Sequence, residues 1–550
     1  MSTTHTISSY LIQTLIDHGV GHVFGVPGDY VLGFYNALEG SPLAVINTCD
    51  EQGAGFAADA YARFNGLGAV CITYSVGGLK VANTTAQAFA EKSPVIVISG
   101  APGVSERSRQ PLLHHKVRNF DTQLKVFEEL TVAAAVLDDP LSACSEIDRL
   151  FDMALRYKRP VYLELPRDMI AAPVTPGRRP GGEKQPGEDG ALQEAVSEAA
   201  ALINKAEKPV IIAGVEMQRF GLQETLRQFL EKSNIPAAAT ILSKSVVRED
   251  HPLYLGVYEG AMGREEVSNY IETSNCLILL GVFMSDVNLG IYTAHLDQTK
   301  AISVSSERVS IHHHVYEGVD MEDFITALAD SIDSRQPAAG ITNPPKAPAC
   351  EPAPDKAITV NYLFQRLNAF LEDSTAVIAD PGDAMFAAID MTIHCASEFT
   401  SPAYYTSLGF AVPASIGVQL ARPDLRPLVL VGDGAFQMTG MELSTTARFG
   451  LNPIVLVLNN GGYGTERPML DGRFNDIHPW KFSRIPEILG AGKGFDVHTE
   501  EELEAALLEA REHLDSFCIL DIHLDPGDRS QALERLTSAL RKRVKQEVTE

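Results

Sequence analysis

The chain has 550 residues, and its 71 Asp and Glu against 45 Lys and Arg give a formal net charge of −26. Hydrophobic residues make up 45% and charged residues 21%, the balance of an ordinary globular protein, and the length exceeds what one hydrophobic core usually supports. The negative charge argues against nucleic acid or an anionic membrane as a partner, because phosphate groups are bound by clustered Lys and Arg.

The first segment, residues 1–171, alternates helical and strand patterns. Ile7, Leu11 and Leu15 recur at helical spacing, and His18-Gly19 supplies a stop signal. Continuous apolar runs then predict strands that are buried on both faces, at 69–72, 95–98 and 161–163. Residues 172–190 are rich in Pro and Gly and predict a linker, because they cannot bury enough apolar surface to fold.

The rest of the chain repeats this organisation twice. Residues 191–334 carry apolar runs at 209–212 and 276–281, and a second Pro-rich linker covers 335–356. Residues 357–550 carry further runs at 377–379, 428–431, 454–458 and 519–520. Strands without alternation are typical of parallel sheets covered by helices. We therefore predict an α/β protein of three doubly wound domains with mainly parallel sheets (1–171, 191–334 and 357–550), whose ligands bind at the carboxyl ends of the strands.

Cysteine usage and the termini indicate the compartment. None of the seven cysteines forms a Cys-x-x-Cys pair, and most lie in apolar runs, so we expect buried free thiols in a reducing environment: Cys49, Cys71, Cys144, Cys276, Cys350, Cys395 and Cys518. Residues 1–18 show no signal-peptide pattern, and no apolar stretch is long enough to span a membrane. The basic run at 541–543 precedes acidic residues and predicts a solvated helix end. We expect a cytoplasmic protein.

Two consecutive predicted strands of the third segment end in metal-binding residue types. The run 428–431 leads into Gly432-Asp433-Gly434, and the run 454–458 leads into Asn459-Asn460-Gly461-Gly462. Carboxylate, amide and backbone carbonyl oxygens are the ligands that Mg²⁺ prefers, with phosphate oxygens and water completing its shell. A helix predicted to start near Ala435 would aim its N-terminus at a diphosphate. Each motif alone could be a simple turn, but the pair favours a metal and phosphate site.

This pair of motifs resembles the motif of thiamine-diphosphate (ThDP) enzymes. The resemblance implies ThDP and Mg²⁺ as cofactors, with Asp433, Asn460 and the carbonyl of Gly462 as metal ligands and Gly434 and Ala435 beside the cofactor. The motif indicates which cofactor is bound but not which reaction is catalysed, because many ThDP enzymes share it.

A second resemblance concerns Glu51, in Asp50-Glu51-Gln52-Gly53-Ala54. Read by itself, Glu51 is an acidic residue at a helix start, where the helix dipole favours it. In ThDP enzymes a glutamate in this context contacts the aminopyrimidine ring and activates the cofactor, which implies that role for Glu51. Gln52 and Gly53 depart from the family's usual Asn-Glu-Leu-Asn-Ala.

Three further motifs narrow the resemblance to the 2-oxo-acid decarboxylases, such as the pyruvate, indolepyruvate and phenylpyruvate decarboxylases. They are Gly25-Val26-Pro27-Gly28-Asp29-Tyr30, Leu112-Leu113-His114-His115 and Gly462-Tyr463-Gly464-Thr465-Glu466, where the family usually has Ser or Thr in place of Gly464. Release of an aldehyde after decarboxylation requires groups that donate and accept protons near neutral pH. The resemblance implies Asp29, His114, His115 and Glu466 for this work, although a His-His pair alone is more often a surface feature.

The same resemblance implies contacts to the cofactor and the substrate. Leu408 would support the bent cofactor, with the carbonyl of Thr406 near its 4′-nitrogen, and Gly382-Asp383 resembles another cofactor-contact turn. Met385 and Thr465 match pocket positions that carry a large aromatic and a branched aliphatic residue in pyruvate-specific members. Met is flexible and Thr is small, so we expect a wider pocket that prefers branched, long or aromatic 2-oxo acids over pyruvate.

Several alternatives stay open at this stage. The chain could be a pyruvate decarboxylase proper, a ThDP-dependent carboligase of the acetolactate synthase type, or a non-enzymatic α/β protein that uses the same turns. The resemblance also implies an active site shared between subunits. The chain is therefore expected to form at least a homodimer, and a tetramer (a dimer of dimers) as is common in this family. The triplet His312-His313-His314 is expected to be structural, because adjacent residues of a strand point to opposite faces.

Overall fold

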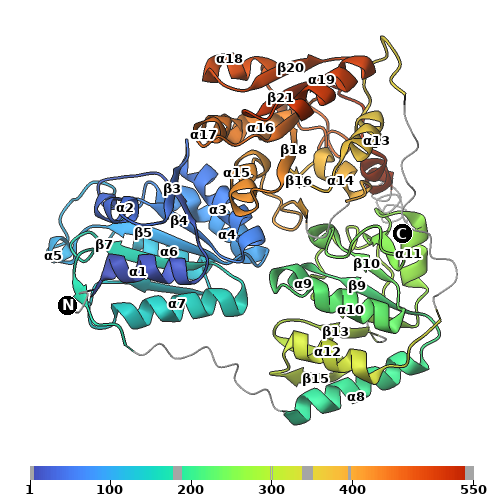
Figure 1. Ribbon diagram of the computed structural model, residues 1–550, viewed down its shortest axis with the longest axis horizontal. Coiled ribbons are helices and arrows are strands. Elements are labelled where there is room, and N and C mark those ends of the chain that lie inside the picture. The colour runs from blue at the N-terminus through green and yellow to red at the C-terminus, as the bar shows by residue number, and fades with distance from the viewer. Residues whose placement is uncertain are drawn as a thin grey trace.

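A computed structural model describes residues 5–177, 189–297, 299, 301–336, 351–393 and 398–538. Helices and strands alternate along three units, each built on its own sheet, with the N-terminal unit at the left of Figure 1, the C-terminal unit at the top and the middle unit below it. The predicted α/β class with mainly parallel sheets is confirmed. The predicted domain boundaries stay a prediction, and Cys350, Cys395 and the basic run 541–543 lie outside the described residues.

The N-terminal unit is a six-stranded parallel sheet with helices on both faces. Its strands are β2 (His22–Gly25), β3 (Ala44–Asn47), β4 (Gly68–Ile72), β5 (Val95–Ala101), β6 (Ala133–Val136) and β7 (Val161–Pro166). Their order is β3-β2-β4-β5-β7-β6. On one face pack α1 (Ile7–Asp17), α2 (Leu32–Glu39) and α7 (Ala143–Tyr157), and on the other α3 (Glu51–Asn65), α4 (Ala82–Ala90) and α6 (Thr122–Leu130). The predicted first helix is confirmed and ends before Gly19, whose φ is 77°.

The C-terminal unit repeats this topology. Its strands are β16 (Thr375–Ala379), β17 (Phe399–Thr400), β18 (Arg426–Gly432), β19 (Ile454–Asn459), β20 (Lys493–Val497) and β21 (Cys518–His523), in the order β17-β16-β18-β19-β21-β20. In both units the first strand along the chain therefore lies between the second and the third. One face carries α13 (Val360–Phe370), α14 (Asp383–Ile389) and α19 (Glu500–Glu512). The other carries α15 (Ala411–Ala421), α16 (Asp433–Thr439), η4 (Gly440–Glu442), α17 (Leu443–Arg448) and α18 (Ile485–Leu489).

The middle unit has a mixed sheet. Five parallel strands are followed by an antiparallel hairpin: β9 (Pro209–Ala213), β10 (Ala237–Ala239), β11 (Tyr254–Val257), β12 (Cys276–Leu280), β13 (Ala301–Val304), β14 (Arg308–Ile311) and β15 (His314–Glu317). Its helices are α8 (Asp189–Lys205), α9 (Val215–Arg219), α10 (Gln223–Ser233), α11 (Glu265–Glu272) and α12 (Met321–Ser331). Two elements fall inside the predicted linker 172–190: the start of α8, and β8 (Pro173–Val174), which pairs with β1 (His5–Thr6) in a small antiparallel sheet.

Two sequence expectations need correction. His312 and His313 do not lie in a strand: they form the exposed turn of the β14–β15 hairpin, with φ of 53° at His312, and only His314 begins β15, where its Nδ1 lies 3.0 Å from Glu198. Cys49 is exposed and not buried, whereas the other free thiols in the described part of the chain are buried: Cys71, Cys144, Cys276 and Cys518.

A buried ion cluster joins the N-terminal and C-terminal units where α3 packs on α15 (Figure 1). The guanidinium of Arg63 lies 2.8 Å from carboxylate oxygens of both Asp59 and Glu91, and these three side chains are almost fully buried. Glu91 in turn accepts the backbone N–H groups of Tyr404 and Tyr405 at 2.9 Å. The contact between the two units thus includes charged groups that have no access to water, beside the apolar side chains of α3 and α15. No helix of the described residues is long and apolar enough to cross a membrane.

Glu259, which follows β11, is fully buried at the contact between the middle and C-terminal units, and neither carboxylate oxygen has a hydrogen-bond partner among the described residues. Burial, reinforced by Asp390 and opposed by Arg535 and Lys244, raises its pKa to about 8 from a usual value of 4.5. A raised native pKa stabilises the fold at low pH, and that stability is lost as pH rises from the unfolded pKa through the native one.

Glu259→Gln should therefore flatten the pH dependence of stability. Between pH 6 and pH 9 we expect the wild type to lose on the order of 2–4 kcal/mol more unfolding free energy than the variant. Thermal unfolding scans at the two pH values, with the cofactors at fixed concentration, measure this difference. Parallel loss of Tm in both proteins would show that Glu259 does not titrate in the folded state.

Candidate active site

The two strand ends predicted to form a metal site lie side by side. Asp433 follows β18 and is the first residue of α16, which starts two residues before the predicted position near Ala435. One oxygen of its carboxylate accepts the N–H of Gly434 at 2.7 Å, and the other accepts those of Gly461 at 2.7 Å and Gly462 at 3.1 Å. The Asp433 carboxylate, at the end of β18, is thus held by backbone N–H groups that follow β19.

These residues fit a divalent cation. The side-chain oxygen Oδ1 of Asn460 is buried without a hydrogen-bond partner among the described residues, and burial raises the pKa of Asp433 to about 6. A cation bound by both oxygens would satisfy the amide and favour the charged carboxylate. A Cβ at position 464 would lie 2.6 Å from Asn460 Nδ2, too close for an ordinary contact. This crowding favours glycine at a position where the family that the sequence resembles has Ser or Thr.

Asp380 holds the turn that carries the predicted cofactor contacts Thr406 and Leu408. It directly follows β16, is fully buried, and accepts the N–H groups of Gly409 at 2.9 Å and Ala411 at 2.8 Å. Burial raises its pKa to about 7. Thr406 has a φ of 56°, and Leu408 packs at the edge of the C-terminal hydrophobic core. The sequence offered one signal for Asp380, an aspartate directly after an apolar strand. Its role could not be predicted because its hydrogen-bond partners lie about thirty residues away along the chain.

The predicted substrate-pocket residues lie near the Gly382 turn. Gly382 has a φ of 116°, which strongly favours glycine, and a Cβ there would lie 3.4 Å from Thr465 Oγ1. Met385 is 1% exposed and belongs to the hydrophobic core behind this turn. The carboxylate of Asp383 is already engaged, because it accepts the N–H of Ser530 at 2.9 Å and the Ser530 hydroxyl at 2.5 Å.

Glu51 is the first residue of α3 and is only 9% exposed. Its Oε2 lies 2.7 Å from Lys80 Nζ, an ion pair that local sequence did not reveal. Gly53 leaves room for Glu442, because a Cβ there would lie 2.1 Å from Glu442 Oε1. Glu442 accepts the N–H groups of Cys49 at 3.1 Å and Asp50 at 3.0 Å. The glycine that departs from the family pattern therefore admits a carboxylate from the C-terminal unit.

Asp29, His114 and His115 come together at one end of the N-terminal sheet. His114 Nε2 lies 2.9 Å from Asp29 Oδ2, and one potential ligand or proton-transfer atom from each of the three residues falls within 4.8 Å of the others. His114 stacks on Tyr30, with ring centroids 4.7 Å apart. His115 has a φ of 68°, and its buried Nδ1 has no hydrogen-bond partner among the described residues. Such a group can take up or release a proton at a bound molecule.

Glu466, the fourth residue predicted to transfer protons, lies apart from this trio in the single chain. It is exposed in the turn that follows Asn460, and no hydrogen bond or ion pair in the described part of the chain links it to Asp29, His114 or His115. The structure thus places the predicted residues on two surfaces, one on the N-terminal unit (Asp29, Glu51, His114 and His115) and one on the C-terminal unit (Asp433, Asn460 and Glu466).

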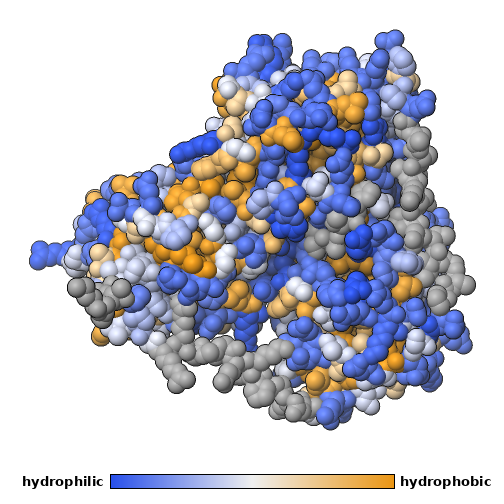
Figure 2. Space-filling model, viewed as in Figure 1, coloured by the Kyte–Doolittle hydropathy of each residue, from blue (hydrophilic) through white to orange (hydrophobic). Residues whose placement is uncertain are grey.

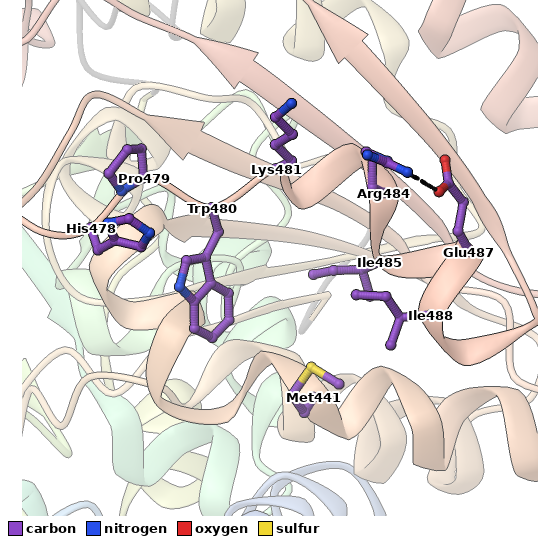
Figure 3. Close-up of a pocket in the computed structure, with 9 residues that line it drawn as sticks. All are labelled: Met441, His478, Pro479, Trp480, Lys481, Arg484, Ile485, Glu487 and Ile488. Atoms are coloured by element: carbon purple, nitrogen blue, oxygen red, sulfur yellow. Dashed lines mark hydrogen bonds and ion pairs between the residues drawn. The ribbon is translucent and has the colours of Figure 1, made fainter.

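A large groove lies beside η4 and α18, and none of the predicted site residues lines it. Figure 3 shows Met441, Trp480 and Ile488 around this groove of 580 Å³, with Arg484 paired to Glu487 at its edge. Its lining is mainly apolar and carries no cluster of proton-transferring or metal-binding groups, so we do not assign it to the chemistry.

Comparison with known proteins identifies related families along the chain. Three family profiles match the chain: the thiamine pyrophosphate enzyme N-terminal TPP binding domain over residues 5–124, the central domain over 196–329, and the C-terminal TPP binding domain over 380–522.

Similar proteins match almost end to end. An indole-3-pyruvate decarboxylase of Azospirillum brasilense is 35% identical over 96% of this chain and 97% of its own length. A pyruvate decarboxylase of Pisum sativum is 33% identical over 96% of this chain and 92% of its own. An alpha-keto-acid decarboxylase of Mycolicibacterium paratuberculosis is 32% identical over 94% of both.

Proposed function

The chain belongs to the ThDP-dependent 2-oxo-acid decarboxylases, and we propose that it converts a branched, long or aromatic 2-oxo acid into an aldehyde and CO₂ with Mg²⁺ beside the cofactor. The observation that carries this proposal is the trio of Asp29, His114 and His115, because decarboxylation to an aldehyde needs groups that move protons near neutral pH.

In this proposal the C-terminal unit holds the cofactor. Asp433, Asn460 and the carbonyl of Gly462 bind Mg²⁺, while Gly434 and Ala435, at the start of α16, face the diphosphate. Thr406 and Leu408 contact the organic part of the cofactor from the turn fixed by Asp380. When bound, ThDP supplies the nucleophile and the electron sink for loss of CO₂.

The N-terminal unit supplies the proton transfers. Glu51, buried at the start of α3, exchanges a proton with the aminopyrimidine ring. Asp29 orients His114 through their 2.9 Å contact, and His115 has a buried ring nitrogen without a hydrogen-bond partner in the described part of the chain. Glu466 completes the set from the C-terminal unit. Four buried free thiols in the described residues favour a reducing compartment, which supports a cytoplasmic location.

Substrate size is the part of the proposal that a kinetic panel tests. Met385 is adaptable and Thr465 is small, so the pocket should accept side chains larger than methyl. We expect kcat/KM for 2-oxoisocaproate or phenylpyruvate to exceed that for pyruvate by roughly tenfold or more, the discrimination that one or two buried methylenes provide. An assay coupled to an alcohol dehydrogenase measures all three substrates. A clear preference for pyruvate would contradict the wide pocket.

We also propose that the active site forms between two copies of the chain, in a dimer or a dimer of dimers. Exposed apolar side chains rim both predicted half-sites: Leu32, Val76, Leu79 and Leu112 on the N-terminal unit, and Met438, Met441, Met469 and Phe474 on the C-terminal unit. Figure 2 shows hydrophobic side chains gathered on the visible face of the N-terminal unit. Exposed patches of this kind are typical of protein interfaces, and a second copy would cover them.

Mixing two inactive variants tests the shared site. Random pairing of Glu51→Gln subunits with Asp433→Asn subunits should restore about a quarter of wild-type activity, because each mixed dimer holds one intact site and one doubly substituted site. If each chain carried a complete site of its own, every site would keep one substitution and the mixture would stay inactive. Each variant alone is the control.

A further inference from the structure

Gln123, which no site prediction includes, lies at the centre of a buried polar network in the N-terminal unit. It is the second residue of α6 and is 1% exposed. Its Oε1 accepts the backbone N–H of Ser75 at 2.5 Å. Its Nε2 donates to the hydroxyls of Ser99 at 2.7 Å and Tyr162 at 2.6 Å. One side chain thus ties α6 to two central strands and to the turn after β4.

The orientation of this amide follows from the protons of its neighbours. The hydroxyl of Ser99 donates to the carbonyl of Gly100 at 2.9 Å, and the hydroxyl of Tyr162 donates to the carboxylate of Glu164 at 2.9 Å. Each hydroxyl has a single proton, so both can only accept from Gln123. The NH₂ group must therefore face Ser99 and Tyr162, which leaves the carbonyl oxygen for Ser75.

The turn that Gln123 holds contacts the activating glutamate. Ser75 is buried with a φ of 60°, a strained conformation for a residue with a side chain. A Cβ at Gly78 would lie 2.2 Å from Gln123 Oε1, so the turn and the amide are packed closely. A Cβ at Gly77 would lie 3.2 Å from Glu51 Oε1, and Lys80, in η1 (Gly78–Val81), pairs with Glu51.

The same turn reaches the proton-transfer trio through Tyr30. Tyr74 donates its hydroxyl to the carbonyl of Phe120 at 2.9 Å, and its ring meets the edge of Tyr30 at a centroid distance of 5.9 Å. Tyr30 stacks on His114. Residues 73–80 therefore lie between Glu51 on one side and His114 on the other. Gln123 holds them through its hydrogen bond to Ser75 from the interior of the domain.

We propose that Gln123 is a positioning residue for the decarboxylation, which sets the turn 73–80 and through it the placement of both Glu51 and His114. This inference rests on the proposed function, since it assigns catalytic value to those two side chains. Loss of one fixed hydrogen bond at such a turn allows a displacement of about an ångström, which can lower a rate about 100-fold when the reacting groups are aligned by it.

Two substitutions separate positioning from packing. Gln123→Ala removes all three hydrogen bonds. Gln123→Glu keeps the shape and the acceptor for Ser75, but its ionised form cannot donate to Tyr162 or Ser99 and lies close to the buried Glu164. Only the protonated form of the new carboxyl restores a donor, so activity lost in Gln123→Glu should return as the pH falls.

Gln419→Ala is the matched control. Gln419 likewise accepts a backbone N–H, that of Asn452 at 3.1 Å, and donates to the Asn452 side chain at 2.6 Å. These bonds lie just before the start of β19, at the end of the sheet opposite Asp433 and Asn460. The control therefore loses an amide's hydrogen bonds away from the predicted site, two part-buried ones in place of the three buried ones of Gln123.

The experiment combines hydrogen–deuterium exchange, without substrate, with steady-state kinetics of the holoenzyme. We expect Gln123→Ala to speed amide exchange in residues 73–81 and to lower kcat about 10–100-fold with KM changed less than about threefold. Gln123→Glu should show a pH profile displaced to lower pH relative to the wild type. Gln419→Ala should change neither the exchange of residues 73–81 nor kcat.

Unchanged exchange in residues 73–81, or full kcat in Gln123→Ala, would overturn the inference while leaving the decarboxylase proposal in place. An equal loss of kcat in Gln419→Ala would also overturn it, because the loss would then be general. A wild type that releases no aldehyde from any 2-oxo acid would instead contradict the proposed function, and the exchange measurement would still show whether Gln123 holds the turn.

Discussion

Glu51→Gln is expected to lower kcat by roughly 10²–10⁴-fold, the range over which a positioned proton-transfer group contributes. Glutamine has the shape of glutamate and can keep a hydrogen bond to Lys80, so the start of α3 should stay folded. It cannot exchange a proton with the aminopyrimidine ring. The loss should appear in kcat and in the rate of cofactor activation, while ThDP binding changes little.

Asp50→Asn provides the control for that experiment. Asp50 caps α3 by accepting the N–H of Gln52 at 2.8 Å, and it also pairs with Lys80. Asparagine caps helices as well as aspartate does, so this variant removes a neighbouring charge and keeps the structure. We expect its kcat within about threefold of the wild type. A Glu51→Gln enzyme that retains more than about a tenth of wild-type kcat would contradict the assigned role.

Asp433→Asn is expected to abolish activity at ordinary Mg²⁺ concentrations. The substitution removes the charge that we propose binds the cation, and it leaves an NH₂ group facing backbone N–H donors. Asp433 accepts from Gly434, Gly461 and Gly462, and an amide has only one oxygen for them. We expect the apparent affinities for Mg²⁺ and ThDP to fall by at least about 100-fold, since a direct ligand should matter more than a group that only orients one.

Calorimetric titration of Mg²⁺ in the presence of ThDP measures this effect. Asp496→Asn is the control, because Asp496 is also a carboxylate in the C-terminal sheet but pairs with His523 at the edge strand β20. It should bind both cofactors like the wild type. Normal Mg²⁺ affinity in Asp433→Asn would contradict the metal site.

Most inner strands of the outer units were predicted from the sequence because they are continuous apolar runs, but the inner strand β2, with only Val23 and Phe24 as apolar residues, was not. Edge strands of the C-terminal unit were missed because they lack such runs: β20 carries Lys493 and Asp496, and β17 has two residues. The β14–β15 hairpin was missed because its turn is His312-His313, which lacks the Gly or Asn that usually marks such turns.

The site was predictable where it depends on local sequence. Asp433 and Asn460 each follow an apolar strand, and adjacent parallel strands bring such ends together. The trio of Asp29, His114 and His115 came from resemblance alone, since 85 residues separate Asp29 from His114. Glu442 and Gln123 could not be found, because their partners are distant in the chain and nothing in the surrounding pattern marks them.

The central claim is that this chain, with ThDP and Mg²⁺, decarboxylates a 2-oxo acid without oxidation. Its most direct test is to measure CO₂ and aldehyde from 2-oxoisocaproate, phenylpyruvate and pyruvate, with and without the cofactors. The account predicts aldehyde and CO₂ in equal amounts, dependence on both cofactors, and near-complete loss in Glu51→Gln. Condensed hydroxyketone as the main product would show a carboligase instead, and no CO₂ from any of the three acids would contradict the account.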